Sequence, residues 1–231
     1  MRGLFLLMLL AHVLFVAAQH SDTKEMGLEG KVKKVITYVY DSALLENGQY
    51  IPVETSFVSR ISYYFDPNGR LDSAHYQLRV EDGRDMMLRI IYEFVNGKRS
   101  GYKEYEQGRL KEEGTVMWLD THNYLTRVKY PDREGGAELV NSLDPQFRDL
   151  RGEVRFFEED GNISFCSSYE NKLDGKKLLQ TLTVDCAAQT ESLRTFIYQE
   201  TDALKNPLIV IGLNGKDQKP ERIWIRKIEY F

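Results

Sequence analysis

The stretch from Leu71 to Gly97 reads LDSAHYQLRVEDGRDMMLRIIYEFVNG, and it decides the fold. Small or apolar side chains alternate with polar ones on both sides of Asp82-Gly83. A period of two is typical of a strand with one buried face, and an Asp-Gly pair is typical of a hairpin turn. We therefore expect one antiparallel hairpin whose buried face carries Ala74, Tyr76, Leu78, Val80, Leu88, Ile90, Tyr92 and Phe94.

Similar turns recur along the chain between runs of aromatic and β-branched residues. They occur at Asn47-Gly48, Asp66-Pro67-Asn68-Gly69, Asn96-Gly97, Gln107-Gly108, Asp160-Gly161, Asp174-Gly175 and Asn214-Gly215. Asn, Asp and Gly tolerate the positive φ that tight hairpin turns require. The sequence therefore predicts a mostly β fold with little helix. We expect an antiparallel meander of long hairpins that forms a twisted sheet or two β lobes.

The alternating pattern stops between residues 131 and 150. Leu139, Leu143, Phe147 and Leu150 are spaced as on one side of a helix, although Pro145 would kink it. We interpret 131–150 as a crossover or a short helix. It would separate an N-terminal β lobe over residues 19–130 from a C-terminal β lobe over residues 151–231.

Residues 1–18 resemble a cleaved signal peptide. Arg2 precedes an apolar run from Leu4 to Val16, and small side chains follow at Ala17 and Ala18. Thirteen helical residues span about 20 Å, which is shorter than the roughly 30 Å core of a bilayer. We therefore expect cleavage before Gln19 and export to the periplasm, the cell surface or the medium.

Charge and the last strand bear on possible partners. The chain carries a net charge of −4, with both signs interspersed, so nucleic acid is not an expected partner. Near the C-terminus, Glu229 and Lys227 alternate with Tyr230, Ile228 and Arg226, so both faces of this strand carry charge. A membrane barrel needs an apolar outer row. We therefore expect no membrane insertion of the mature chain. The oligomeric state stays open.

Two cysteines, Cys166 and Cys186, fall in the predicted exported part. An even pair in an exported chain indicates a disulfide. Cys166 alternates with Ser168, whereas Cys186 alternates with Val184, and these two rows resemble different faces. A bridge would then require a bulge, and the alternative is a pair of separate buried thiols.

No catalytic, cofactor-binding or metal-binding residues are predicted. His20, His75 and His122 are not spaced to share a metal, and His75 falls on a polar strand face. The acidic run from Glu158 to Asn162 lacks the spacing of a calcium loop, so we interpret it as a charged hairpin turn. The chain contains 14 tyrosines, most of them on apolar faces. Tyr64 is the exception, and we take it as a candidate ligand-facing aromatic residue.

Two segments carry a family resemblance: Leu28-Glu29-Gly30-Lys31-Val32-Lys33 and Tyr64-Phe65-Asp66-Pro67-Asn68-Gly69-Arg70-Leu71. The chain resembles the YD-repeat (Rhs-like) exported β proteins in these segments. The resemblance implies a twisted antiparallel sheet or shell with a binding or scaffolding role. Our leading hypothesis is thus an exported binding or structural protein for a glycan or a protein. The alternative is a secreted glycosidase-like hydrolase whose paired carboxylates the sequence does not single out.

Overall fold

The computed structural model describes residues 23, 26–80, 83–175 and 177–231. In these ranges the chain forms antiparallel strands and one turn of 3-10 helix, η1 (Glu54–Ser56), with no α-helix. The strands are β1 (Val32–Tyr40), β2 (Ala43–Glu46), β3 (Gln49–Pro52), β4 (Phe57–Phe65), β5 (Leu71–Arg79), β6 (Asp85–Val95), β7 (Lys98–Glu106), β8 (Arg109–Trp118), β9 (Asn123–Lys129), β10 (Gly136–Leu143), β11 (Asp149–Phe157), β12 (Ile163–Asp174), β13 (Lys177–Asp185), β14 (Thr190–Thr201), β15 (Pro207–Asn214) and β16 (Pro220–Tyr230). The predicted signal peptide at residues 1–18, with its cleavage point before Gln19, lies outside the described residues.

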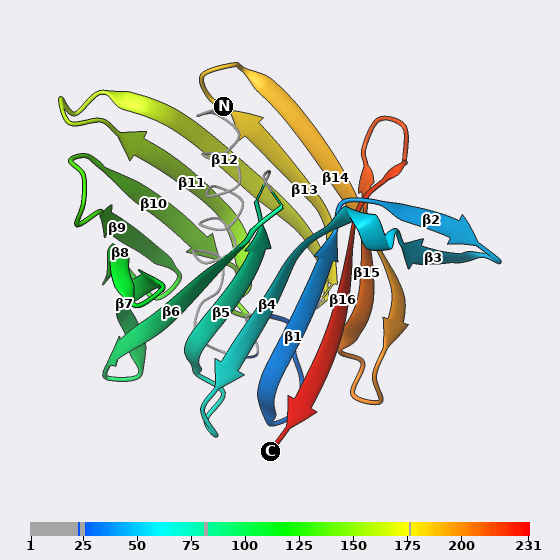
Figure 1. Cartoon of the computed structure of the whole chain (residues 1–231). Coiled ribbons are helices and arrows are strands. Elements are labelled where there is room, and N and C mark those ends of the chain that lie inside the picture. Colours follow the sequence, from blue (N-terminus) through cyan, green and yellow to red (C-terminus); the bar gives the residue numbers. More distant parts are fainter. Residues whose placement is uncertain (1–22, 24–25, 81–82, 176) are drawn as a thin grey trace.

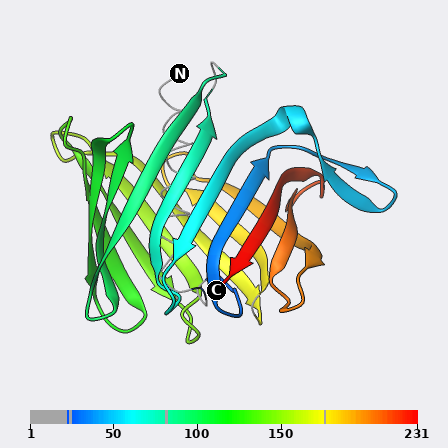
Figure 2. The same cartoon turned by 60° about the horizontal axis from the view of Figure 1, so that its bottom comes forward.

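Fourteen of these strands form one closed barrel (Figures 1 and 2). Each barrel strand pairs with its neighbours along the chain, and β1 also pairs with β16, which closes the ring. The predicted antiparallel meander of hairpins is confirmed. The predicted twisted sheet or pair of β lobes is wrong, because the first and last strands join through eight residue pairs from Val32 and Tyr230 to Tyr40 and Ile223.

The Gly-marked turns connect the strands as predicted. Asn96 and Gly97 have φ of 52° and 75°, and Gln107 and Gly108 have φ of 48° and 82°. Positive φ at both central residues gives the hairpin turn whose twist matches that of its strands. At the Asp66 turn, the carboxylate accepts hydrogen bonds from the backbone N–H groups of Asn68 and Arg70, both at 2.9 Å. These contacts fix the turn locally, so its sequence alone signals it.

The β5–β6 hairpin has the predicted register. Ala74 pairs with Ile90 and Tyr76 pairs with Leu88, and all four side chains are buried. Glu81 and Asp82 lie outside the described residues, but the Val80 N–H donates to the Arg84 carbonyl oxygen across the turn. The neighbouring hairpin pairs Phe65 with Leu71. The prediction of one shared buried face is confirmed.

The short helix expected within 131–150 is wrong. Residues 136–143 form β10, which pairs with β9 on one side and β11 on the other. Ala137, Leu139 and Leu143 are buried, and a spacing of four fits both a strand and a helix. Pro145 and Phe147 lie in the tight turn from Asp144 to Arg148, where Phe147 has a φ of 64°.

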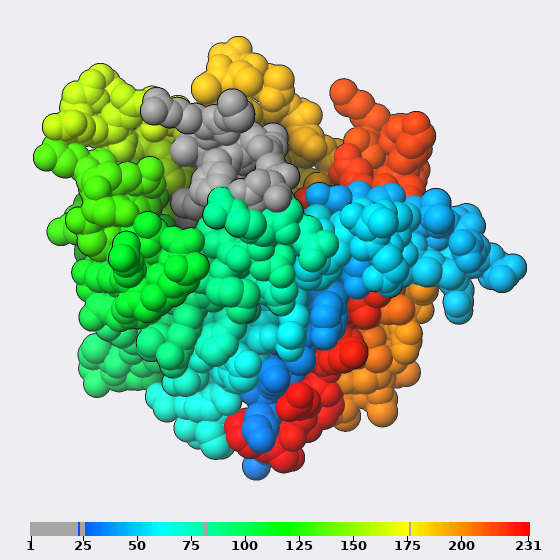
Figure 3. All heavy atoms as spheres, in the orientation of Figure 1, coloured from blue at the N-terminus to red at the C-terminus, as the bar shows by residue number. Residues whose placement is uncertain are grey.

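The two faces of the barrel wall differ in character. One face carries a cluster of buried apolar and aromatic side chains that extends over β1, β4 to β7, β9 to β11, β15 and β16, and this is the inner face. A smaller apolar cluster lies outside, where Tyr40, Ile211 and Ile223 pack with Ala43 of β2. The β2–β3 hairpin projects from the barrel beside this cluster (Figure 3). Its Tyr50 backbone exchanges two hydrogen bonds with the Gln199 side chain, at 2.6 and 3.1 Å.

Glycines let inner aromatic rings lie flat against neighbouring strands. A Cβ added to Gly114 would come within 2.0 Å of the Tyr102 ring, and one added to Gly152 would come within 2.5 Å of the Tyr169 ring. Real Cβ atoms do not approach other atoms so closely, so both positions require glycine for these contacts. These pairs hold two tyrosines in fixed positions on the inner wall.

Candidate functional site

A row of tyrosines crosses the inner face of three neighbouring strands. Tyr63 on β4, Tyr76 on β5 and Tyr92 on β6 are all 5% exposed or less. The Tyr63 and Tyr76 rings pack edge to face with centroids 6.4 Å apart. Burial, and then the nearby Tyr63 and Tyr92, raise the pKa of Tyr76 well above its usual value. The row is therefore neutral at physiological pH, and its burial agrees with the apolar strand faces that the sequence predicts.

An arginine lies at each end of this tyrosine row. Arg99 on β7 is 2% exposed, and its guanidinium stacks over the Tyr92 ring at 4.3 Å from the centroid. Arg226 on β16 is half-buried and lies near Tyr63 and Tyr198. Burial lowers the pKa of both arginines, but arginine keeps its charge in proteins. The inner wall therefore holds two cations beside aromatic rings.

Neither arginine has its hydrogen-bonding capacity filled. In the described part of the chain, Nε and Nη2 of Arg99 and Nε of Arg226 are buried and have no hydrogen-bond partner. No carboxylate there forms an ion pair with either guanidinium. A buried charge without a counter-charge is costly, so these two groups stand out from the rest of the interior.

A pair of glutamates lies further along the same inner wall. Glu104 on β7 pairs directly with Glu112 on β8. The Tyr102 hydroxyl donates a hydrogen bond to Oε1 of Glu112. Burial, followed by the nearby charge of Glu112, raises the pKa of Glu104 to about 8, and burial raises the pKa of Glu112. The interior thus contains one carboxyl group, that of Glu104, that holds a proton near neutral pH, and a second whose pKa is raised.

A third inner polar group surrounds Asp149 at the start of β11. The Tyr169 hydroxyl donates to Asp149 Oδ1 at 2.7 Å, and Asn171 Nδ2 donates to Oδ2 at 3.1 Å. Asn141 Nδ2 in turn donates to the Tyr169 hydroxyl at 2.8 Å. Burial outweighs these bonds and raises the pKa of Asp149 to about 7. The side chains bond mainly to one another, which is typical of a structural network.

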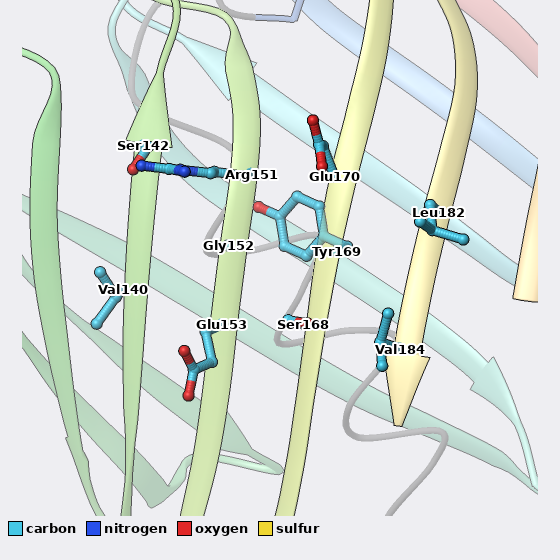
Figure 4. Close-up of a pocket in the computed structure, with 10 residues that line it drawn as sticks. All are labelled: Val140, Ser142, Arg151, Gly152, Glu153, Ser168, Tyr169, Glu170, Leu182 and Val184. Carbon is cyan, nitrogen blue, oxygen red and sulfur yellow. The ribbon is translucent and has the colours of Figure 1, made fainter. Parts of the chain in front are cut away.

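The outer face has its own depression of about 410 Å³ over β10 to β13 (Figure 4). Its lining combines aliphatic side chains, including Val140 and Leu182, with charged ones, including Arg151 and Glu170. The Tyr169 ring lies against the strand beside Gly152 in this view. The depression is shallow and of mixed charge, and among its described lining residues no buried acid or base points into it from the outer face.

The predicted disulfide is present beside this depression. Cys166 on β12 and Cys186 after β13 are bonded, with their Cα atoms 5.3 Å apart. Ser168 pairs with Val184, so both cysteines lie on the same face and the expected bulge is not needed. A bridge closing a loop of this length stabilises by about 3 kcal/mol in the chain-entropy model.

The other residues singled out by the sequence lie outside the barrel. Tyr64 is on the outer face, where its ring packs against that of His75 at 4.9 Å and lies 5.2 Å from the Lys34 ammonium group. Glu158 to Asn162 forms the expected charged turn, closed by the hydrogen bond from the Glu158 N–H to the Asn162 carbonyl oxygen. Within the described ranges, no group of three or more His, Cys, Asp or Glu side chains is placed to hold a metal.

No protein-family model matches the chain, and no curated protein matches its sequence. The structure is similar to that of a porin-like protein from Bacteroides vulgatus ATCC 8482, with a TM-score of 0.52 and 10% identity over 88% of this chain and 99% of that one. A porin-like protein from Bacteroides uniformis ATCC 8492 matches with a TM-score of 0.30 and 7% identity over 86% of this chain and 98% of that one. A LolA superfamily protein from Nitrosomonas europaea matches with a TM-score of 0.27 and 8% identity over 90% of both chains.

The first of these similarities concerns the barrel fold alone, and the other two are too weak to bear on function. No helix within the described ranges has the length and apolar character that a membrane span requires. The residues of the barrel wall are therefore the basis for a functional proposal.

Proposed function

We propose that this protein is an exported β-barrel that stays in an aqueous compartment and binds a ligand with apolar parts inside the barrel. The observation that carries the proposal is the contrast between a charged outer face and an aromatic inner face. The proposal places the ligand inside the barrel, instead of beside the outward-facing Tyr64 that the sequence suggested.

The outer face supports an aqueous location. On β6 the outward row includes Asp85, Arg89 and Glu93, and on β9 it includes Arg127 and Lys129, all of them exposed. A barrel that crosses a bilayer needs an apolar outer band about 25 Å tall. Charges in the middle of several strands are the reverse of that pattern.

The inner face supports ligand binding. Eight strands enclose an interior that side chains nearly fill, and more strands enclose a wider one. The wall of this barrel has fourteen. The inner aromatic side chains Phe165, Phe196 and Tyr198 are only half-buried, although they pack against the main core cluster. Half-buried aromatic rings facing inward are the groups that an apolar ligand would cover.

Binding of the neutral fluorescent probe N-phenyl-1-naphthylamine tests this proposal. The protein purified after export should bind the probe with increased fluorescence, and Phe196→Ala should weaken binding several-fold because it removes an inner ring. Ile197→Ala is the matched control, because Ile197 is the next residue on β14 and lies outside at 39% exposure. Absence of probe binding, or an equal loss in both variants, would overturn the proposal.

Two facing glutamates favour one alternative function, the predicted secreted glycosidase-like hydrolase. Directly opposed residues on antiparallel strands have Cβ atoms about 4.5 to 5.5 Å apart. Glu104 and Glu112 are such a pair, and burial raises the pKa of both, that of Glu104 to about 8. Retaining glycosidases use two carboxyl groups about 5 to 5.5 Å apart, one of them with a raised pKa. The predicted secreted hydrolase would then use these two glutamates.

Aryl glycosides test this alternative. A hydrolase should release nitrophenol from at least one of a panel of 4-nitrophenyl glycosides, and Glu112→Gln should lower that rate at least about 100-fold because it removes one of the two carboxyl groups. Glu113→Gln, which alters the next and outward-facing residue, should keep the rate. A panel without turnover would rule out the alternative and leave the binding proposal standing.

A further inference from the structure

The two inner arginines place a chemical constraint on the ligand. Arg99 and Arg226 lie at opposite ends of the row formed by Tyr63, Tyr76 and Tyr92, and the described part of this wall supplies neither of them with a carboxylate. Removing a charge from water without a counter-charge is costly. Such a cation is retained at less cost when an anionic group of the ligand compensates for it.

The surroundings of Arg226 indicate where the ligand would lie. Trp224 is two residues earlier on the same face of β16, and its ring is 5.8 Å from the Phe196 ring on β14. Phe196 and Tyr198 are half-buried, so this part of the inner wall leaves aromatic surface uncovered. A guanidinium group beside uncovered aromatic surface matches a molecule with an anionic head and an apolar tail.

The acidic side chains on the same inner wall do not repel an anionic ligand. Burial raises the pKa of Glu104 to about 8 and also raises that of Glu112, so burial disfavours the charged form of both carboxyl groups. Arg194, a third inner arginine, already forms an ion pair with Glu221 at 3.4 Å. The charges left without a partner on the described part of this wall are therefore cationic.

We infer that the ligand is an amphiphile with an anionic carboxylate or phosphate head, bound by Arg226, and with an apolar tail along the inner aromatic side chains. This inference rests on the proposed function, because it names the chemical class of the molecule inside the barrel. Arg226 provides charge and directed N–H donors, and the aromatic rings provide apolar contact area.

Four amphiphiles of equal chain length test the inference at pH 7, each below its micellar concentration. Dodecanoate should bind at least about ten-fold more tightly than dodecanol, and dodecyltrimethylammonium should bind more weakly than either. Tighter binding of dodecyl phosphate than of dodecanoate would indicate a phosphate head, and the reverse order would indicate a carboxylate head. The affinities would be measured by titration calorimetry on the protein purified after export.

Arginine variants assign the head group to its site. Arg226→Met should weaken dodecanoate binding about ten-fold and leave dodecanol binding unchanged, whereas Arg226→Lys should retain part of the preference. Arg99→Met, at the other end of the tyrosine row, should leave the preference for dodecanoate unchanged. Arg89→Met on the outer face of β6 is the matched control and should have no effect. Unchanged dodecanol binding shows that each variant is folded.

Two outcomes separate this inference from the function on which it rests. Equal affinities for dodecanoate and dodecanol, with both bound, would overturn the anionic head and leave an apolar ligand in place. Failure of all the amphiphiles and of the neutral probe to bind would overturn both. A preference for dodecanoate that persists in Arg226→Met would show that the head binds elsewhere.

Discussion

Replacing Ile90 with aspartate should lower the free energy of unfolding by more than about 4 kcal/mol. Ile90 is 1% exposed on the inner face of β6 and pairs with Ala74 across the β5–β6 hairpin. The change removes a buried aliphatic side chain and places a carboxylate in the same apolar environment. Urea denaturation followed by tryptophan fluorescence measures the effect as a lower midpoint.

The matched control is Arg89→Asp at the neighbouring position. Arg89 is exposed on the outer face, opposite His75 on β5 and Tyr105 on β7. A surface substitution of this kind usually changes stability by no more than about 0.5 kcal/mol. Equal midpoints for the two variants would show that β6 presents the opposite face to the interior, and that the register of the β5–β6 hairpin differs from the pairing of Ala74 with Ile90.

Local sequence signals predict the hairpins but not the closure of the barrel. The Asp66 turn and the Asn96-Gly97 turn are determined by residues within a few positions, and alternation assigns the two faces of each strand. Pairing of β1 with β16 joins Val35 to Ile228, and no local pattern marks that contact. Both strands have the pattern of ordinary half-buried strands, so a closed and an open meander have the same sequence signature.

Two wrong predictions, the helix within residues 131–150 and the bulge at the disulfide, have a shared cause. Leu139 and Leu143 are four residues apart, which fits one side of a strand as well as one side of a helix. The polarity of neighbouring residues suggests different faces for Cys166 and Cys186, but the pairing of Ser168 with Val184 places serine and valine on one outer face. Outer rows of this barrel mix apolar and polar residues, so polarity alone assigns their faces poorly.

The candidate site is not predictable from the sequence for a related reason. Glu104 and Glu112 become partners only through the register of β7 and β8, and a bulge follows directly between Glu104 and Tyr105. In the sequence, Arg99 and Arg226 are visible only as charged residues in alternating rows that are otherwise apolar. Arg226, for example, lies between Trp224 and Ile228 in such a row. An inward charge in an otherwise apolar row is the signal that could have identified the site, but it gains this meaning only in a closed barrel.

The buried glutamate pair should make the protein less stable as the pH rises. The ordinary pKa of 4.5 applies to Glu104 in the unfolded chain, and burial raises the pKa to about 8 in the folded barrel. The folded state therefore holds this proton more tightly than the unfolded state. Its stabilising effect is fully present below about pH 4.5 and is lost progressively as the pH rises to about 8.

Glu104→Gln isolates this effect, because glutamine keeps the shape but cannot ionise. A pKa difference of this size corresponds to a change on the order of 4 kcal/mol in the free energy of unfolding. The protein should lose about that much more stability than Glu104→Gln between pH 5 and pH 8.5, as measured by urea denaturation. Glu113 lies on the outer face of β8, in contact with Lys103 at 3.6 Å. Glu113→Gln should therefore show the same pH dependence of the free energy of unfolding as the unmodified protein. Parallel curves for the unmodified protein and Glu104→Gln would show that Glu104 is ionised inside the barrel throughout this range, and that the inner wall near Tyr102 is open to water.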